Sequence, residues 1–167
     1  NPINLSIGQP DFPVPQAIKD AASQAIHQDR NGYSVTQGIA PLRERLLAGV
    51  RREQAHGDRQ VLVTSGTSGA LVLALLSVVN PGDEVIVFDP YFVMYPSLVA
   101  MVGGQAVMID TYPDFHIDVN RVADAITPRT KAVLFNSPAN PTGAVAPEQN
   151  VRDLAQLCAD RDILLVS

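Results

Sequence analysis

The sequence predicts an α/β protein: a three-layer, mainly parallel sheet with helices on both faces. From residue 61 onward, short apolar and β-branched runs alternate with helical stripes. Strands that alternate with helices in this way form parallel sheets with right-handed crossovers. Hydrophobic residues make up 46% of the 167 residues and charged residues 17%. This balance suits a sheet buried on both faces and excludes a disordered chain.

The first 60 residues show helices but no strand pattern. Prolines interrupt residues 4–15 at spacings through which a helix cannot run, so this segment is an extended arm. A helical stripe follows over 16–28, and Asn31-Gly32 breaks it. Pro41 fits the first turn of a second helix that we expect to run to about residue 56.

The remaining elements follow one another in strict alternation. The predicted strands are 61–64, 84–88, 106–109, 132–135 and 163–166. The predicted helices are one that begins after Gly66 and those at about 94–102, 118–126 and 147–160. Parallel strands are covered on both faces. We therefore expect these strand residues to be mostly buried: Val61, Val63, Val85, Val87, Val107, Val133, Leu134, Leu164 and Leu165.

Unusual loops follow the first, second and fourth predicted strands. They lie at the carboxyl ends of these strands, which is where parallel α/β sheets bind ligands. In the first, residues 65–69, glycines and hydroxyls lead into a helix. Backbone N–H groups and the helix dipole could hold a phosphate there, with Thr67 and Ser68 as further donors. An ordinary turn with a Ser or Thr N-cap is the alternative. The loop matches neither the dinucleotide nor the NTPase glycine signature.

The other two loops carry aromatic rings and an amide. Residues 89–95 include Tyr91, Phe92 and Tyr95, whose rings could stack on a flat heterocycle or pack in the core. In residues 136–143, Asn140 precedes a proline, which restricts its backbone and could aim its amide at a ring hydroxyl. A plain Asn-Pro turn is the alternative for this loop.

Taken in order, the three loops resemble those of the pyridoxal-phosphate aminotransferases of fold type I, class I/II. The motifs are Ser-Gly-Thr-Ser-Gly-Ala-Leu, Asp-Pro-Tyr-Phe-Val-Met-Tyr and Asn-Ser-Pro-Ala-Asn-Pro-Thr-Gly. Upstream, residues 5–12 and 31–43 are similar to the family's arm and its Tyr-containing segment. The resemblance implies that residues 1–40 are an arm, helix and cofactor-approach loop. Residues 41–167 would then be the first part of the cofactor-binding large domain, in a chain truncated at both ends.

The resemblance implies a role for each matching position that faces the cofactor, pyridoxal 5'-phosphate. Gly66, Thr67 and Ser68 would hold its phosphate. Phe92 would stack on its pyridine ring, and Asn140 would hydrogen-bond its phenolic oxygen.

Other positions would serve the partner subunit, the substrate or the catalytic step. Tyr33 would reach the phosphate bound by the other subunit of a homodimer, and Gly8 and Tyr95 would lie on the substrate side. The family's Schiff-base lysine lies in a Ser-x-x-Lys motif or a close variant. Neither Lys19 nor Lys131 matches it. We therefore expect that lysine beyond residue 167, no catalytic residue in this chain, and no activity of the chain alone.

Charge and composition limit the partners. A net charge of −5 argues against a nucleic-acid surface, and no stretch approaches the roughly 18 apolar residues of a membrane span. Cys158 is the single cysteine, which excludes an internal disulfide and suits a cytoplasmic protein. No metal site is indicated.

The expected function is amino-group transfer between an amino acid and a 2-oxo acid. Another fold type I enzyme (a carbon–sulfur lyase, a decarboxylase or an acyl-transferring synthase) and a non-catalytic cofactor-binding regulator domain are the alternatives.

Overall fold

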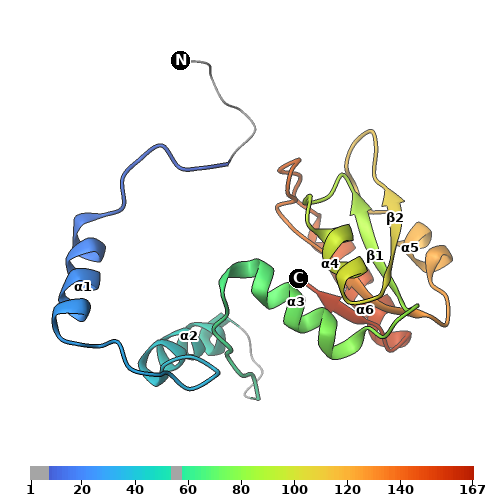
Figure 1. The fold of residues 1–167 in the computed structure, drawn as a ribbon. Coiled ribbons are helices and arrows are strands. Elements are labelled where there is room, and N and C mark those ends of the chain that lie inside the picture. Colours follow the sequence, from blue (N-terminus) through green and yellow to red (C-terminus); the bar gives the residue numbers. More distant parts are fainter. Residues whose placement is uncertain (1–7, 54–57) are drawn as a thin grey trace. The chain divides into compact units, whose positions relative to one another are not determined.

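The computed structural model describes residues 8–53 and 58–167 (Figure 1). The chain divides into two compact units, Asn1–Val63 and Thr64–Ser167, and each is described by itself. The boundary expected from the sequence between residues 40 and 41 concerns the domains of the intact protein and stays a prediction.

The first unit contains the helices α1 (Gln16–His27) and α2 (Ala40–Glu53). Pro15 directly precedes α1, where its fixed φ suits a helix start, and the Gln16 side chain donates to Asp20 at 2.7 Å. Both helices begin where the sequence predicts them, and the predicted end of the second, at about residue 56, lies outside the described residues. No residue of α1 is buried, so this helix is not part of a hydrophobic core within its unit.

The prediction of a strand at residues 61–64 is wrong for this structure. The segment forms no ladder with any described residue, and one backbone bond joins it to an earlier loop, from Val63 N–H to Gln37 C=O at 3.0 Å. A β-branched run becomes a strand only where a neighbouring strand pairs with it. Val63 also packs against Gly38, whose φ is +98° and where a Cβ would lie 2.7 Å from Val63. Only glycine fits that position.

The second unit is built on a four-stranded sheet in which every pairing is parallel. Its strands are β1 (Glu84–Asp89), β2 (Gln105–Asp110), β3 (Thr130–Leu134) and β4 (Leu164–Val166), in the spatial order β2-β1-β3-β4. Its helices are α3 (Gly66–Val78), α4 (Tyr95–Met101), α5 (Val119–Ala125) and α6 (Glu148–Asp160). The predicted α/β class and the parallel sheet are confirmed.

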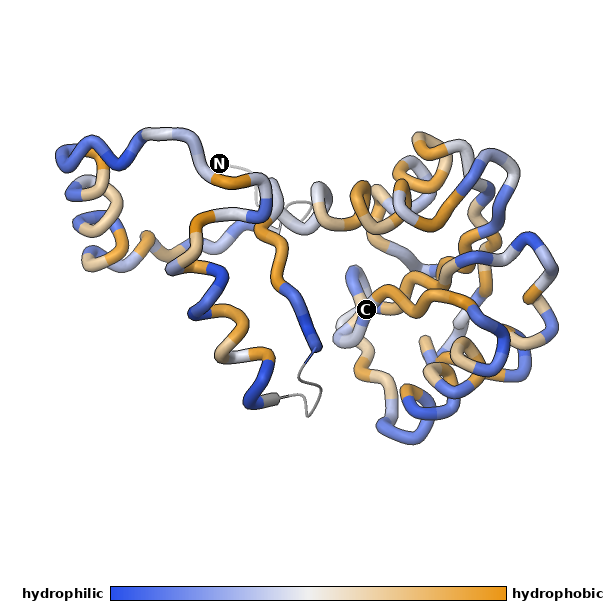
Figure 2. The backbone as a smooth tube through the Cα atoms, turned by 90° about the horizontal axis from the view of Figure 1, so that it is seen from below, coloured by the Kyte–Doolittle hydropathy of each residue, from blue (hydrophilic) through white to orange (hydrophobic). Residues whose placement is uncertain are grey.

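Side-chain alternation along the strands gives the sheet two hydrophobic cores. Val85 and Val87 of β1 point into a core that includes residues of α3 and α4. Ile86, between them, points into a core that includes Val122 of α5 and Leu154 of α6. The strands and α3 are largely hydrophobic along their length (Figure 2). Helices therefore cover both faces, as the sequence predicts.

Burial of the strand residues follows their place in the sheet. Val85, Val87, Val133 and Leu134, on the central strands, are buried as expected. The expectation is wrong for Leu164, which is 42% exposed, and too strong for the half-buried Val61, Val63, Val107 and Leu165. β2 and β4 are the edge strands, and 61–64 is not in the sheet, so fewer neighbours cover these side chains.

The strand order creates a topological switch point between β1 and β3. From β1 the chain crosses through α4, on one face, to β2. From β3 it crosses through α6, on the other face, to β4 in the opposite direction. Connections that diverge in this way leave a crevice at the carboxyl ends of the two central strands, where open α/β sheets bind ligands.

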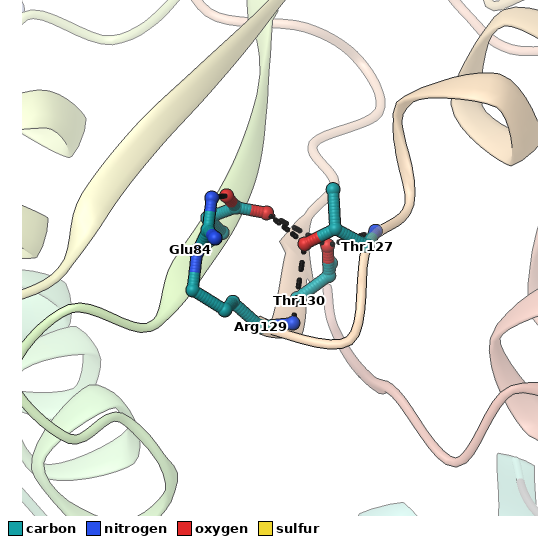
Figure 3. A network of polar contacts seen from close by, with 4 residues as sticks. All are labelled: Glu84, Thr127, Arg129 and Thr130. Atoms are coloured by element: carbon teal, nitrogen blue, oxygen red, sulfur yellow. Dashed lines mark hydrogen bonds and ion pairs between the residues drawn. The ribbon is translucent and has the colours of Figure 1, made fainter.

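At the opposite, amino end of β1, a polar network holds the strand to the turn before β3 (Figure 3). Glu84 is only 4% exposed. Its carboxylate accepts hydrogen bonds from Thr127 Oγ1 at 2.5 Å and Thr130 Oγ1 at 3.3 Å, and it pairs with the Arg129 guanidinium. The Thr127 hydroxyl lowers the pKa of Glu84 most and burial raises it. Arg129 and Thr130 lower it further, so the pKa lies below its usual value. This network braces the sheet at the end away from the switch point.

Candidate functional site

The N-terminus of α3 offers free backbone donors. Helix geometry leaves the first N–H groups of a helix without intrahelical acceptors, and the N-cap residue Ser65 makes no side-chain bond to them. Gly66 N–H donates to Thr64 C=O at 2.9 Å, so the donors open to a ligand are those that follow Gly66. Gly66 has φ +69° and turns the chain into the helix, and a Cβ added there would meet nothing within 4 Å. The helix start, with the hydroxyls of Thr67 and Ser68 in its first turn, can therefore bind an anion.

A side-chain contact joins this helix start to the loop after β1. The Ser68 hydroxyl donates to Met94 Sδ at 3.4 Å, and Met94 is the N-cap residue of α4. In the same loop, the rings of Phe92 and Tyr95 meet edge to face, with centroids 5.6 Å apart. Phe92 is half-buried, so its ring is packed against a neighbour and still partly accessible. The phosphate-binding candidate and the ring-stacking candidate thus lie on adjoining segments.

A small cavity lies at the switch point and brings the second and third loops together. Its lining includes Tyr91, Tyr95, Thr111, Phe115, Asn136 and Asn140. Its enclosed volume is about 40 Å³, which is room for a few waters. Burial raises the pKa of Tyr95, so its hydroxyl remains a hydrogen-bond donor at neutral pH. Phe92 is not among the lining residues.

The third loop is held in shape by its own hydrogen bonds. Ala139 N–H donates to Ala144 C=O at 2.8 Å, and Gly143 N–H donates to Ala139 C=O at 2.7 Å. Asn140 N–H donates to the side-chain oxygen of Asn136 at 2.5 Å. The Asn140 residue itself is exposed at the rim of the cavity. Its amide is therefore accessible to a ligand.

Tyr33 and Gly8 lie in the first unit. Tyr33 is fully exposed, and nothing lies within 4 Å of the position a Cβ would take at Gly8. The two units are described separately, so the roles predicted for these residues stay predictions.

Sequence reasoning missed two residues that shape the site, Thr111 and Asn136. Thr111 is buried, and both its N–H and its hydroxyl donate to Asp89 C=O, at 2.9 Å and 2.8 Å. These two hydrogen bonds fix the end of β1, where the aromatic loop begins. Both missed residues are polar and come just after a predicted strand, which is the signal that could have indicated them.

Other classes of site find no support in the part of the chain that the structure describes. Within residues 8–53 and 58–167, no group of three His, Cys, Asp or Glu side chains could hold a metal ion. Among the helices of those same residues, none is long and apolar enough to cross a membrane.

What the second unit does assemble is an anion-binding helix start, an accessible aromatic face and an exposed amide. Together these suit a flat heterocycle that carries a phosphate and a ring hydroxyl.

Comparison with known protein families matches residues 1–167 to the family described as aminotransferase class I and II. The aspartate/prephenate aminotransferase of Thermus thermophilus is 43% identical over 169 residues, which cover 99% of this chain and 44% of that protein. The probable aspartate aminotransferase of Methanocaldococcus jannaschii is 38% identical over 167 residues, with coverages of 99% and 44%.

Solved structures agree with these relatives. A tetra mutant of Thermus thermophilus aspartate aminotransferase superposes with a TM-score of 0.92 at 44% identity, over 96% of this chain and 46% of that one. The N-succinyldiaminopimelate aminotransferase of Mycobacterium tuberculosis gives a TM-score of 0.89 at 35% identity, with coverages of 96% and 44%. The chain spans less than half the length of the curated relatives it matches.

Proposed function

The chain belongs to the class I and II aminotransferase family, and from that premise we propose that the full-length protein is a pyridoxal 5'-phosphate-dependent aminotransferase. It would move an amino group between an amino acid and a 2-oxo acid. The observation that carries this proposal is the meeting of the three family-like loops at the switch point of the sheet. Ser68 contacts Met94, and one cavity joins Tyr95 to Asn140.

The described residues fit the cofactor group by group. The start of α3, with Gly66, Thr67 and Ser68, suits the phosphate because no side chain of the N-cap residue occupies its backbone donors. Phe92 offers a partly accessible ring that would orient the cofactor's plane. The exposed amide of Asn140 would donate from Nδ2 to the ring hydroxyl oxygen and stabilise negative charge there. When bound, the cofactor supplies an aldehyde and a ring that accepts electrons.

We place Tyr33, Gly8 and Tyr95 in supporting roles. Tyr33, fully exposed in its unit, would donate to the phosphate held by the second subunit of a homodimer. Gly8 and Tyr95 would line the substrate side, where Tyr95 keeps its proton at neutral pH. We also propose a cytoplasmic location for the full-length protein.

The described part of the chain offers no lysine for the proton-transfer step. Lys131 Nζ donates to Pro128 C=O at 3.5 Å, at the amino end of β3 and away from the switch point. Lys19 is exposed on α1 of the first unit. We therefore propose that residues 1–167 alone bind the cofactor weakly and do not transaminate. A positioned general base contributes roughly 10²–10⁴-fold to such a reaction.

The test compares the isolated 167-residue chain with the full-length protein. Each is mixed with pyridoxal phosphate, an amino acid and a 2-oxo acid, and the new amino acid is quantified against free cofactor. The full-length protein should turn over and the chain should stay at background. Turnover by the chain would show that Lys19 or Lys131 serves the site. Release of ammonia with sulfide, or of carbon dioxide, by the full-length protein would indicate a lyase or a decarboxylase instead.

A further inference from the structure

Asn136 is the second residue beyond the end of β3, at the switch point. The residue before it, Phe135, donates its N–H to Val166 C=O of β4 at 2.8 Å. The backbone that leads into Asn136 is therefore fixed to the sheet. Its side chain is half-buried and lines the same cavity as Asn140 and Tyr95.

The side-chain oxygen of Asn136 holds the peptide of Asn140. Asn140 N–H donates to Asn136 Oδ1 at 2.5 Å, a short contact for an amide donor. The other bonds of the loop fix other residues: Ala146 N–H donates to Ser137 Oγ at 3.0 Å, and Ala144 N–H donates to Thr142 Oγ1 at 3.2 Å. Because the backbone of a residue sets where its side chain projects, this bond relates the direction of the Asn140 amide to the rigid sheet.

We propose that Asn136 is a positioning residue, whose side-chain oxygen fixes the peptide of Asn140 so that the Asn140 amide donates to the ring oxygen of the cofactor. The proposal rests on the proposed function, because it gives Asn140 that ligand. Asn136 acts through Asn140 and need not touch the cofactor. Net hydrogen-bond free energies predict that its loss weakens cofactor binding by about 3–10-fold.

The experiment uses the full-length protein and the variants Asn136→Ala, Asn140→Ala and the double variant, with two readouts. In the cofactor-free protein, hydrogen exchange of residues 136–146 is followed by mass spectrometry. Asn136→Ala should speed this exchange, and Asn136→Asp, which keeps an acceptor oxygen, should preserve wild-type protection. Asn120→Ala is the matched control, because Asn120 is exposed on α5.

The second readout is the pH midpoint of the bound cofactor's visible absorbance. Loss of a donor to an anionic oxygen destabilises the anion, so Asn140→Ala should raise the midpoint. Asn136→Ala should raise it in the same direction by a smaller amount, and the double variant should match Asn140→Ala because both changes act through one bond. A residue that only stabilises the fold would lower the unfolding temperature without moving the midpoint. If Asn136→Ala does not fold, Asn136→Leu removes the acceptor at similar volume.

The outcomes separate the positioning role from the proposed function. If Asn140→Ala raises the midpoint while Asn136→Ala changes neither readout, the positioning role is wrong and the function stands. If the full-length protein binds no cofactor, the function fails and the positioning role fails with it. If cofactor binds and Asn140→Ala leaves the midpoint unchanged, the role given to Asn140 is wrong, and Asn136 has nothing to position.

Discussion

Replacement of Glu84 by Gln should destabilise the fold at neutral pH although the site lies far from the switch point. The Glu84 carboxylate accepts from Thr127 Oγ1 at 2.5 Å in a buried setting, and a bond to such a charged group contributes about 1.5–3 kcal/mol. Arg129 is 63% exposed, so its ion pair adds only about 0–1 kcal/mol. The bond from Thr130, at 3.3 Å, adds little. We expect Glu84→Gln to cost about 2–3 kcal/mol in the free energy of unfolding.

This cost should depend on pH in a defined direction. The pKa of folded Glu84 lies below its ordinary value of 4.5, mainly because of the Thr127 hydroxyl. The unfolded chain therefore takes up a proton at Glu84 before the folded protein does. The stabilisation is fully present above about pH 4.5 and is lost as the pH falls through the lower, folded pKa. The difference between wild type and Glu84→Gln should shrink over the same range.

The assay is urea unfolding followed by circular dichroism, at one protein concentration, between pH 7 and pH 3. Glu148→Gln is the matched control, because Glu148 pairs with Arg152 on the exposed surface of α6 at 2.6 Å. An exposed i,i+4 pair contributes only about 0.3–0.5 kcal/mol. The reasoning is refuted if Glu84→Gln costs no more than Glu148→Gln at pH 7, or if its cost stays constant down to pH 3.

Three further predictions address the site and the core. Gly66→Ala should weaken cofactor binding and cost about 1–2 kcal/mol in unfolding free energy, because φ is +69° and the new Cβ would meet no neighbour to offset the strain. Cofactor affinity by equilibrium dialysis and a urea midpoint that both match wild type would contradict this. Leu154→Ala should cost about 2–5 kcal/mol in unfolding free energy because the side chain is fully buried, whereas Leu164→Ala, on an exposed edge strand, should cost far less. Equal shifts of the urea midpoint in the two variants would argue against the two-core description. Tyr33→Phe should lower cofactor affinity in the full-length protein, while Tyr112→Phe, at another exposed tyrosine, should not. If a fluorescence titration gives the Tyr33→Phe variant the cofactor affinity of wild type, Tyr33 does not contact the phosphate.

The sequence predicted most of the second unit because its signals are local. The apolar runs in β1 and β3 and the helical stripe of α6 reflect burial on both faces of a sheet, and such patterns are visible in a single chain. The loop motifs around Gly66, Phe92 and Asn140 are likewise contiguous, so the family could be identified from them.

Predictions that depend on neighbours from elsewhere in the fold succeeded only in part. Leu164 has the same pattern as the buried Val133, and yet it is exposed because β4 is an edge strand. Residues 61–64 look like a strand, but no described segment pairs with them. Whether a run is central, at an edge or unpaired follows from the strand order, which periodicity does not encode.

By itself, then, the sequence determined the element types and their order, apart from the unpaired run at residues 61–64, and the three loops that carry the family's motifs. Each of these is a property of neighbouring residues. Only the tertiary structure decided that the order β2-β1-β3-β4 places two of these loops around one cavity, and that Ser68 reaches Met94 of the next loop. Such contacts form only after crossovers bring distant segments together, and their partners are therefore chosen by packing rather than by local sequence.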